Sequence, residues 1–579
     1  MRVVSVLFVD LVGFTTLSES RDAEDVRDLL SRYFETARTI VGRYGGTIEK
    51  FIGDAVMAVW GAPVAREDDA ERAVRAGLDL IDAVAAFGAE AGAPDLQARG
   101  GVVTGRAAAV DSSAEGIVTG DSVNTAARIQ GIAEPGSLCV DDVTRQVTSS
   151  AIAYADAGEH ILKGKAEPVR VWHAERVVAG VAGALRTGGV EAAFVGRELE
   201  LRLVKELFHS VLDRGAARLV TVSGSAGVGK SRLGWEFEKY IDGIANVVLW
   251  HRGRCLSYGD GVAYWALAEM VRGRFGITED QSPPEAAQLL EDGLERWIAE
   301  PSERGYIAAR LGALLGLGDP ALGREELFAG WRLFVERLAE HSPVLLVFED
   351  LQWADAGLLD FLEHLLEWSA EKPIFILTFA RPELAERRKD WASGRRGATP
   401  IYLEPLGDVV MGELLDSLVD DLPEAARERI VQQAQGIPLY AIETVRALAD
   451  RGVLTEEQGR LRRTGDVGEL DVPASLSSLL AARLDGLEPE ERELVKGLSV
   501  FGGTFPRTAA AALGDLPEER LEEVLGALVR KEILVIRADP LAPDRGQYAF
   551  AQTLLRTVAY DMLSRRERKP RHIAAATHL

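Results

Sequence analysis

The sequence predicts a multidomain α/β protein. Its 579 residues are enough for about three or four domains of ordinary size. Apolar residues make up 47% of the chain, which supplies several hydrophobic cores and excludes wholesale disorder. Strand and helix patterns alternate twice, over residues 3–110 and again from Phe194 to Pro405. We therefore expect two α/β domains and a mainly helical remainder.

The charge balance and the lack of long apolar runs limit what the chain does. The formal net charge is −24, which argues against broad binding to nucleic acid or to an anionic membrane, since both need a basic surface. Cys139 and Cys255 are too few for a disulfide scaffold or a thiolate zinc site. No apolar run approaches the ~20 residues that span a bilayer, and Asp10 interrupts the first one, unlike a signal peptide. We expect a soluble cytoplasmic protein that contacts no membrane.

Residues 1–176 are predicted to form the first α/β domain. Apolar spacing predicts a strand over 3–9, a helix over 23–44, strands over 47–52 and 55–60, a helix over 68–87 and a strand over 101–110. Gly53 and Asp54 form the tight turn between the two middle strands. This β-α-β-β-α-β order is that of a ferredoxin-like unit. Strand-like segments near Ser137 and over 169–174 complete the domain.

The rest of the chain divides by its composition and periodicity. The predicted segments are a Gly-, Ala- and Val-rich linker (177–193), a second α/β domain (194–405), a helical lid (406–471), a winged-helix domain (472–565) and the start of a further helical region (566–579). Apolar runs at 218–222 and 344–348 are typical of parallel strands covered on both faces. A strand pair after helices, at 533–537 and 547–550, predicts the winged helix. Because the sequence stops inside an expected helix, we expect a longer chain.

Two aspartates at strand ends form the first candidate site. Asp10 lies where the first strand passes into a helix, and Asp54 lies in the turn between two strands. Taken singly, each is more often a turn or cap residue. Together, two carboxylates can hold divalent cations, which prefer hard oxygen ligands and bring phosphate oxygens with them. The backbone N–H groups from Val12 through Phe14 to Thr15 open a helix and can bind phosphate.

Three segments in combination resemble the class III nucleotide cyclases. They are Phe8–Thr15, Glu49–Met57 and Gly120–Arg128, and their order and spacing both agree with that family. The resemblance covers about residues 2–176. It implies a ferredoxin-like class III cyclase domain that converts ATP into 3′,5′-cyclic AMP and pyrophosphate, with two Mg²⁺ or Mn²⁺ ions in each site.

The resemblance also implies a role for each matching residue. Asp10 and Asp54 match the aspartates that hold the paired ions. Asn124 matches the residue that orients the ribose, and Arg128 matches the one that stabilises the pentavalent transition state. Lys50 matches the position that reads the purine, where lysine implies ATP and glutamate implies GTP.

Two further positions match phosphate-binding residues, and one departs from the family. Arg99 and Lys163 match the residues that hold the outer phosphates, with Lys165 as a close alternative to Lys163. Ile117 stands where the family usually has an Asp or Thr that accepts a hydrogen bond from the adenine amino group. An isoleucine packs on a purine but accepts no hydrogen bond, so we expect weaker base selectivity. Thr119 would lie on the same face of a strand and is the alternative acceptor.

The family pattern also implies an assembly. In these enzymes the metal-binding aspartates come from one cyclase domain, and the Lys, Asn and Arg come from a second. This chain has one such domain, so the resemblance implies a homodimer with two equivalent sites.

A complete G-x-x-x-x-G-K-[ST] motif stands at Gly224 to Ser231, after an apolar strand and before a helix. Gly224, Gly227 and Gly229 let backbone N–H groups surround the phosphates of ATP or ADP. Lys230 would neutralise the outer phosphate oxygens, and the motif's final serine would coordinate Mg²⁺. The motif predicts that the second α/β domain is a P-loop NTPase with a parallel sheet.

Downstream strands supply partners for this loop. The apolar run 344–348 ends in Glu349 and Asp350. Taken alone, these two acids fit a solvated strand end as well as they fit a magnesium site. After a phosphate loop, either acid can hold the magnesium and leave the other to polarise the attacking water, and we assign the metal to Asp350. The run 374–378 is followed by Arg381, which we expect to serve as a polar sensor of the nucleotide.

Four segments resemble the STAND class of signalling ATPases over about residues 194–563. They are Phe194–Glu198, Glu349–Asp355, Gly436–Pro438 in the lid, where Pro438 would contact nucleotide, and Phe550–Arg556. The resemblance implies a switch that holds ADP in a closed form and opens on nucleotide exchange. The family often has histidine where this chain has Gln552, which predicts a weaker closed state.

The leading interpretation is an adenylate cyclase governed by an attached nucleotide-switch ATPase. In a first alternative the cyclase fold is a degenerate dimerisation module and the ATPase is the output, which the departure at Ile117 favours. In a second alternative the chain regulates transcription through its winged helix. The net charge of −24 disfavours the second, and the basic run Arg565–Lys569 is read as a solvated helix end.

Overall fold

The computed structural model describes residues 2–576 apart from 15–21, 63, 91–92, 94–95, 110–117, 120, 164, 166–167, 179–191, 256–262, 279–280, 319–321, 451, 458–459, 465–475, 502–503, 515, 532 and 540–541. The chain divides into two compact units. One comprises Met1–Val181 with Glu238–Val247, and the other comprises Ala182–Phe237 with Val248–Leu579. Most of the predicted linker (177–193) lies outside the described residues.

The first unit is built on an eight-stranded sheet in the order β2-β3-β1-β4-β6-β8-β7, with β5 paired to β4. Its strands are β1 (Arg2–Val12), β2 (Thr47–Ile52), β3 (Ala55–Trp60), β4 (Gln97–Ala109), β5 (Val118–Thr119), β6 (Leu138–Asp141), β7 (Ile152–His160) and β8 (Val169–Val177). Its helices are α2 (Ala23–Arg43), α3 (Asp69–Glu90), α4 (Asp121–Ile132) and α5 (Asp142–Thr148). The predicted β-α-β-β-α-β order is present, and the antiparallel arrangement β2-β3-β1-β4 is ferredoxin-like.

The two faces of β1 pack against different helices. Val6 and Phe8 join a buried cluster with Ile129 of α4. Leu7 points to the other face and reaches Gly77 of α3, where an added Cβ would lie 3.2 Å from the Leu7 side chain. This period-two alternation buries β1 on both sides, so its first polar side chain after the apolar run stands at the end of the sheet.

The second unit contains a five-stranded parallel sheet in the order β10-β11-β12-β9-β13. Its strands are β9 (Arg218–Gly224), β10 (Leu249–Arg254), β11 (Val344–Glu349), β12 (Ile374–Ala380) and β13 (Ala398–Leu403). Its helices are α6 (Glu198–Arg214), the first part of α7 (Lys230–Gly243, whose residues from Glu238 belong to the first unit), α8 (Trp265–Phe275), α9 (Pro283–Glu295), α10 (Pro301–Leu314), α11 (Arg324–His341), the 3₁₀ helix η1 (Leu351–Trp353), α12 (Ala356–Trp368) and α13 (Glu383–Arg387). The predicted parallel strands at 218–222 and 344–348 are therefore confirmed.

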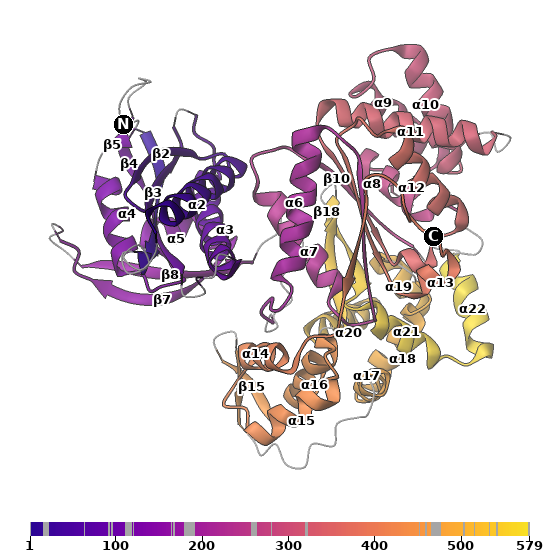
Figure 1. The fold of residues 1–579 in the computed structure, drawn as a ribbon. Helices are drawn as coiled ribbons and strands as arrows, with labels where there is room; N and C mark the ends of the chain where they lie inside the picture. The colour runs from indigo at the N-terminus through magenta and orange to yellow at the C-terminus, as the bar shows by residue number, and fades with distance from the viewer. Residues whose placement is uncertain are drawn as a thin grey trace. The chain divides into compact units, whose positions relative to one another are not determined.

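Helices cover both faces of this parallel sheet, as Figure 1 shows for α6 on one side and α12 on the other. On β12, the ring of Phe375 lies 5.6 Å from that of Phe208 on α6. The alternate residues Ile374 and Ile376 join a separate cluster with Phe361 of α12. Burial on both faces explains why the strands are continuous apolar runs in the sequence.

The C-terminal part of the second unit has two further cores. The first lies among α14 (Asp408–Leu418), α15 (Glu424–Ala434), α16 (Pro438–Asp450) and a small sheet of β14 (Val419–Asp420), β15 (Leu454–Glu457) and β16 (Arg460–Arg463). The second lies among α17 (Leu476–Asp485), α18 (Pro489–Leu498), α19 (Arg507–Gly514), α20 (Glu518–Arg530), α21 (Thr553–Asp561), α22 (Arg565–Ala576) and the hairpin of β17 (Leu534–Asp539) and β18 (Ala542–Phe550). The predicted strand pair is confirmed, whereas the lid and winged-helix interpretations stay predictions. Within the described ranges, every helix is too short or too polar to cross a bilayer.

Candidate active site and nucleotide-binding loop

The fold brings Asp10 and Asp54 to one end of the first sheet. β1 pairs with β3 so that Val9 lies opposite Val56, next to the two aspartates. Gly53, in the left-handed region at φ +65°, forms the turn that presents Asp54. Burial, followed by the charge of Asp10, raises the pKa of Asp54 above its usual range. Two adjacent carboxylates are a donor set that divalent cations fit.

Asp10 has two polar neighbours from other elements. Arg99 of β4 lies opposite Asp10 in the strand register, with 3.5 Å between its guanidinium and Oδ2. Gln130 of α4 places Nε2 3.5 Å from the same oxygen. The residue that we expected to hold outer phosphates therefore lies beside the proposed metal ligand. Sequence reasoning missed Gln130, whose signal is a polar residue at a buried position of an amphipathic helix.

The remaining predicted cyclase residues stand apart from this pair. Asn124 and Arg128 lie four residues apart on α4, on a face directed away from the buried Ile129. Asn124 is exposed, Arg128 is half-buried and Lys50 on β2 is exposed. In the described part of the chain, none of these three side chains hydrogen-bonds or pairs with Asp10 or Asp54. One chain thus presents two separate sets of functional groups.

The remaining predicted substrate-binding residues of the first domain differ in their exposure, and two of them lie outside the described residues. Lys163 is exposed in a turn, whereas Lys165 forms an ion pair with Asp121 at 2.5 Å. Phe14 is half-buried two residues after the end of β1. Thr15 and Ile117 lie outside the described residues.

The phosphate loop joins β9 to α7, as the motif predicts. Gly227 and Gly229 adopt positive φ angles of 78° and 109°, which a residue with a side chain rarely takes. Lys230 folds back into the loop, with Nζ donating to the carbonyls of Gly224 at 2.7 Å and Ser225 at 2.8 Å. Burial, followed by the Arg381 charge, lowers the pKa of Lys230 to about 8. The lysine thus uses loop carbonyls as partners where a nucleotide would supply phosphates.

Two segments far from the loop in sequence brace it. Arg197, which is buried, donates to the carbonyl of Val228 at 3.4 Å. Leu439, on the first turn of α16, donates its backbone N–H to the Gly227 carbonyl at 3.3 Å. An added Cβ on Gly227 would lie 2.9 Å from the Leu439 Cβ. Pro438 is the first residue of that helix and is half-buried.

The two acids at the end of β11 share Arg254, which lies 3.7 Å from Asp350, and differ in their other partners. Glu349 is buried and held by two arginines of β10: Arg252 bonds Oε1, and Arg254 bonds Oε2 at 2.7 Å. Asp350 adopts a left-handed backbone at φ 54° and accepts from Gln352 Nε2 at 3.0 Å. Its charge acts on Lys230, so Asp350 is the acid that faces the phosphate loop. The structure therefore favours Asp350 over Glu349 at the nucleotide.

Sequence reasoning missed the residues that organise this pair of acids. Gln352 joins Asp350 to Arg381, because its Oε1 accepts the Arg381 backbone N–H at 3.0 Å. The sequence does contain a signal for Arg252 and Arg254, because they are alternate residues of a strand and such residues point to the same face of a sheet. Ser231 is exposed at the start of α7, and its role as an ion ligand stays a prediction.

Gln552 contacts a buried carboxylate. Its Nε2 donates to Glu443 of α16 at 2.5 Å. Glu443 has no exposed surface and also pairs with Arg446 at 2.8 Å and Arg483 of α17 at 2.6 Å. Burial would raise the pKa of Glu443, but Arg483 and Arg446 outweigh it and lower that pKa. This cluster joins the helices around α16 to the helices around α17 and α21.

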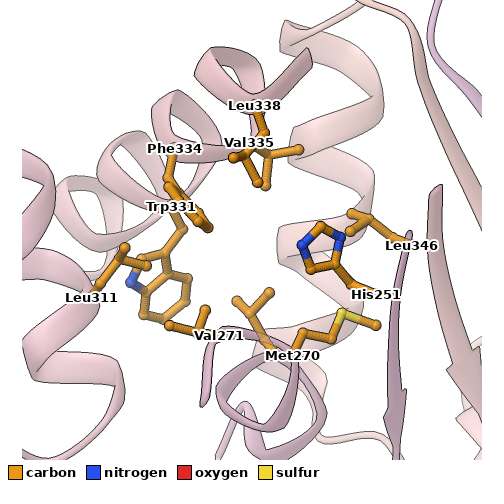
Figure 2. A pocket seen from close by; sticks show the side chains of 10 residues that line it. His251, Met270, Val271, Leu311, Trp331, Phe334, Val335, Leu338 and Leu346 are labelled. Carbon is orange, nitrogen blue, oxygen red and sulfur yellow. The ribbon is translucent and has the colours of Figure 1, made fainter. Parts of the chain in front are cut away.

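A small cavity lies behind β10, between the sheet and helices α8, α10 and α11 (Figure 2). Its volume of about 20 Å³ has room for about one water molecule. His251 lines it, and neither ring nitrogen has a hydrogen-bond partner among the described residues. Burial above all lowers the pKa of His251 to about 3, so the ring is neutral. Because the other lining residues are apolar, we assign the cavity to the core.

We predict that Glu443→Gln destabilises the second unit by about 3 kcal/mol, because it removes the buried charge that Arg483 and Arg446 share. Chemical denaturation of the full chain measures the change. The matched control is Glu367→Gln, which removes an ion pair with Arg395 on a largely exposed side chain and should cost below about 1 kcal/mol. Equal small effects of both variants would contradict the assigned role of the cluster.

Comparisons with known proteins agree with this division of the chain. Residues 1–175 match the family described as adenylate and guanylate cyclase catalytic domain, and residues 193–377 match the AAA ATPase domain family. An uncharacterized protein of Rhizobium meliloti is 28% identical over 99% of this chain and 55% of its own length. Adenylate cyclase 1 of the same organism is 38% identical over 22% of this chain and 20% of its own length. The chain thus spans about half the length of the first relative and a fifth of the second.

Solved cyclase structures also resemble the chain. The adenylyl cyclase CyaB from P. aeruginosa is 30% identical, covering 30% of this chain and 94% of that one, with a TM-score of 0.29. The guanylate cyclase domain of RhGC from Catenaria anguillulae, solved with GTP, is 26% identical, covering 31% of this chain and 98% of that one, with a TM-score of 0.28. By the family matches, residues 1–175 are similar to the adenylate and guanylate cyclase catalytic domain, and residues 193–377 are similar to the AAA ATPase domain.

Proposed function

We propose that the chain is an adenylate cyclase that acts as a homodimer and is regulated by its ATPase domain. The observation that carries the proposal is the separation of two sets of groups within one chain. Asp10 and Asp54 adjoin at one end of the sheet. Asn124 and Arg128 present another face of α4 and make no contact with them among the described residues. Two chains arranged about a twofold axis would combine one set from each into a complete site.

Asp10 and Asp54 would hold Mg²⁺ or Mn²⁺, two ions in each site, because both offer hard carboxylate oxygens. The bound ions would activate the ribose 3′-hydroxyl and neutralise charge on the phosphates. Arg99 is within reach of the same place, since its guanidinium lies 3.5 Å from Asp10. Once a cation neutralises Asp10, Arg99 is free to pair with the outer phosphates, together with the exposed Lys163.

The proposed reaction is an internal displacement in ATP. The 3′-oxygen loses its proton and bonds to the α-phosphorus, while the bond from that phosphorus to pyrophosphate breaks. The partner's Asn124 would orient the ribose, and the partner's Arg128 would stabilise the added charge on the transition state. The partner's Lys50 would donate to N1 of adenine, which accepts a hydrogen bond, whereas N1 of guanine carries a proton. Because ATP is a cytoplasmic metabolite, we place this activity in the cytoplasm.

We propose that the ATPase domain is a STAND-type nucleotide switch that binds ATP or ADP with Mg²⁺. Lys230 would exchange its loop carbonyls for phosphates, and Ser231 and Asp350 would hold the ion. Glu349 is occupied by Arg252 and Arg254 and cannot polarise water in this arrangement. Slow hydrolysis and a long-lived bound state follow, which suits a switch better than a motor. The α16 contact with Gly227 gives the nucleotide a direct connection to the helical region.

We predict that Asp54→Ala abolishes cyclic AMP formation, because one carboxylate cannot hold both ions. Product formation from ATP and from GTP, with Mg²⁺ and with Mn²⁺, measures the effect and also determines the base preference. ATP binding at the phosphate loop should be unchanged and serves as the control for folding. Unchanged product formation by the variant would refute the metal assignment.

We predict that mixing the inactive variants Asp10→Ala and Arg128→Ala restores part of the activity. Each variant lacks a different half of the site, so a heterodimer regains one complete site. Differently tagged chains allow the heterodimer to be isolated before assay. An isolated heterodimer with no activity would disprove the shared site.

We predict that Lys230→Ala changes the cyclase rate several-fold, equivalent to ~1–2 kcal/mol of coupling. The substitution removes phosphate affinity at the switch and touches no cyclase residue. A nucleotide shifts the cyclase dimer only by as much as it binds one arrangement better. The rate is compared at matched dimer concentration with the wild-type chain and with residues 1–176. Identical rates for all three would mean that the two domains are only tethered.

A further inference from the structure

Gln130 is a buried polar side chain that connects helix α4 to the end of β1. Only 9% of its surface is exposed. Its Nε2 donates to Oδ2 of Asp10 at 3.5 Å, although the two residues are 120 positions apart in the sequence. Burying an amide costs free energy unless the amide is hydrogen-bonded, and an apolar side chain would fill the same place without that cost. The amide at this position is therefore best explained by its carboxylate partner.

The backbone of α4 lies directly against β4 at this level of the sheet. Gly101 of β4 is opposite Phe8 of β1, two residues before Asp10. An added Cβ on Gly101 would lie 2.5 Å from the backbone nitrogen of Gln130 and 2.7 Å from the carbonyl oxygen of Ala126, closer than real Cβ atoms come. Because strand and helix are in contact here without an intervening side chain, the fold fixes where the Gln130 side chain starts. The amide is thus held beside Asp10 by the packing of the sheet.

The two donors beside Asp10 differ in charge. Arg99 and Gln130 both contact Oδ2 at 3.5 Å, and neither contact uses Oδ1. A guanidinium charge opposes a divalent cation on the same carboxylate, whereas a neutral amide does not. Gln130 can therefore keep its hydrogen bond to one carboxylate oxygen while the other oxygen binds an ion, and Arg99 cannot remain there at so low a cost.

We infer that Gln130 is a positioning residue of the metal centre, which holds the Asp10 carboxylate in the orientation that binds a divalent cation. The inference rests on the proposed cyclase function. A donor on the second oxygen of a metal-binding carboxylate fixes its orientation and strengthens the site. Gln130 and Arg128 are two residues apart on α4, roughly 200° around the helix, so they point to different sides. Arg128 would act in the partner's site, and Gln130 acts in the site of its own chain.

The first test is Gln130→Met in the full chain, which removes the amide and keeps an unbranched side chain of similar length. Mn²⁺ binding without nucleotide, followed by electron paramagnetic resonance of the free ion, should weaken by about tenfold. Gln146→Met is the matched control, since Gln146 Nε2 also donates to a carboxylate, Asp142 Oδ2 at 2.6 Å, but on α5. That control should keep its Mn²⁺ affinity. Both variants should retain the wild-type midpoint of unfolding in urea without metal.

The second test uses isolated heterodimers to show which site Gln130 serves. With Gln130→Met and Arg128→Ala chains, the one complete site takes Asp10 from the Arg128→Ala chain, whose Gln130 is intact. Its Mn²⁺ requirement for cyclic AMP formation should equal that of the wild type. With Gln130→Met and Asp10→Ala chains, the complete site takes both aspartates from the Gln130→Met chain, so about tenfold more Mn²⁺ should be needed. The reversed pattern would place Gln130 in the partner's site and overturn the inference.

The outcomes separate the inference from the proposed function. Weaker Mn²⁺ binding by Gln130→Met with its unfolding midpoint retained supports the positioning role. Wild-type Mn²⁺ affinity in Gln130→Met, beside a loss in Asp54→Ala, would overturn the role of Gln130 and leave the metal site standing. A lower unfolding midpoint in Gln130→Met than in Gln146→Met would mean that the amide serves the fold, and would also overturn it. Equal Mn²⁺ binding by wild type and Asp54→Ala would remove the metal site itself, and the inference with it.

Discussion

The antiparallel pairing of β1 with β3 on one side and with β4 on the other is the constraint on which the candidate active site depends. That register sets Val9 opposite Val56 and Asp10 opposite Arg99. Asp10 therefore lies at the same end of the sheet as Asp54 in the β2–β3 turn. The guanidinium of Arg99 lies beside Asp10. The two buried faces of β1 fix the register, because a slip of one residue would turn Phe8 and its neighbours to the wrong helix.

A comparable constraint orders the second site. β11 lies between β10 and β12, so a carboxylate at its end can be reached from either neighbour. Glu349 takes the arginines of β10, and the left-handed backbone of Asp350 directs the next carboxylate towards Lys230. The two consecutive acids share Arg254, which also lies 3.7 Å from Asp350, but their other partners differ. In a strand, consecutive side chains point to opposite faces of the sheet. Because the backbone turns at Asp350, the Asp350 carboxylate has surroundings that differ from those of Glu349.

The elements that periodicity defines were predictable, and the contacts between elements were not. β1, α2, the β2–β3 turn and the parallel strands follow from apolar spacing and turn residues, which act over a few positions. The short α5 and strand β7 were missed, because they contain too few buried positions for a period to show. Arg252 on Glu349 and Gln130 on Asp10 join residues about a hundred positions apart, and no local pattern records such a pair. Arg99 was predicted as a phosphate ligand from its motif, but its place beside Asp10 depends on strand register.

Two of the groups that would meet a ligand already have internal partners in this structure. Asp10 has Arg99, and Lys230 has the loop carbonyls. Binding must therefore exchange one set of interactions for another, and the affinity is the difference between the two sets. At the cyclase site this exchange links two ligands. In the proposed function, a cation on Asp10 would displace the Arg99 charge, and the released guanidinium would then attract phosphate. Metal and nucleotide should consequently strengthen each other's binding to an equal extent, as linkage requires.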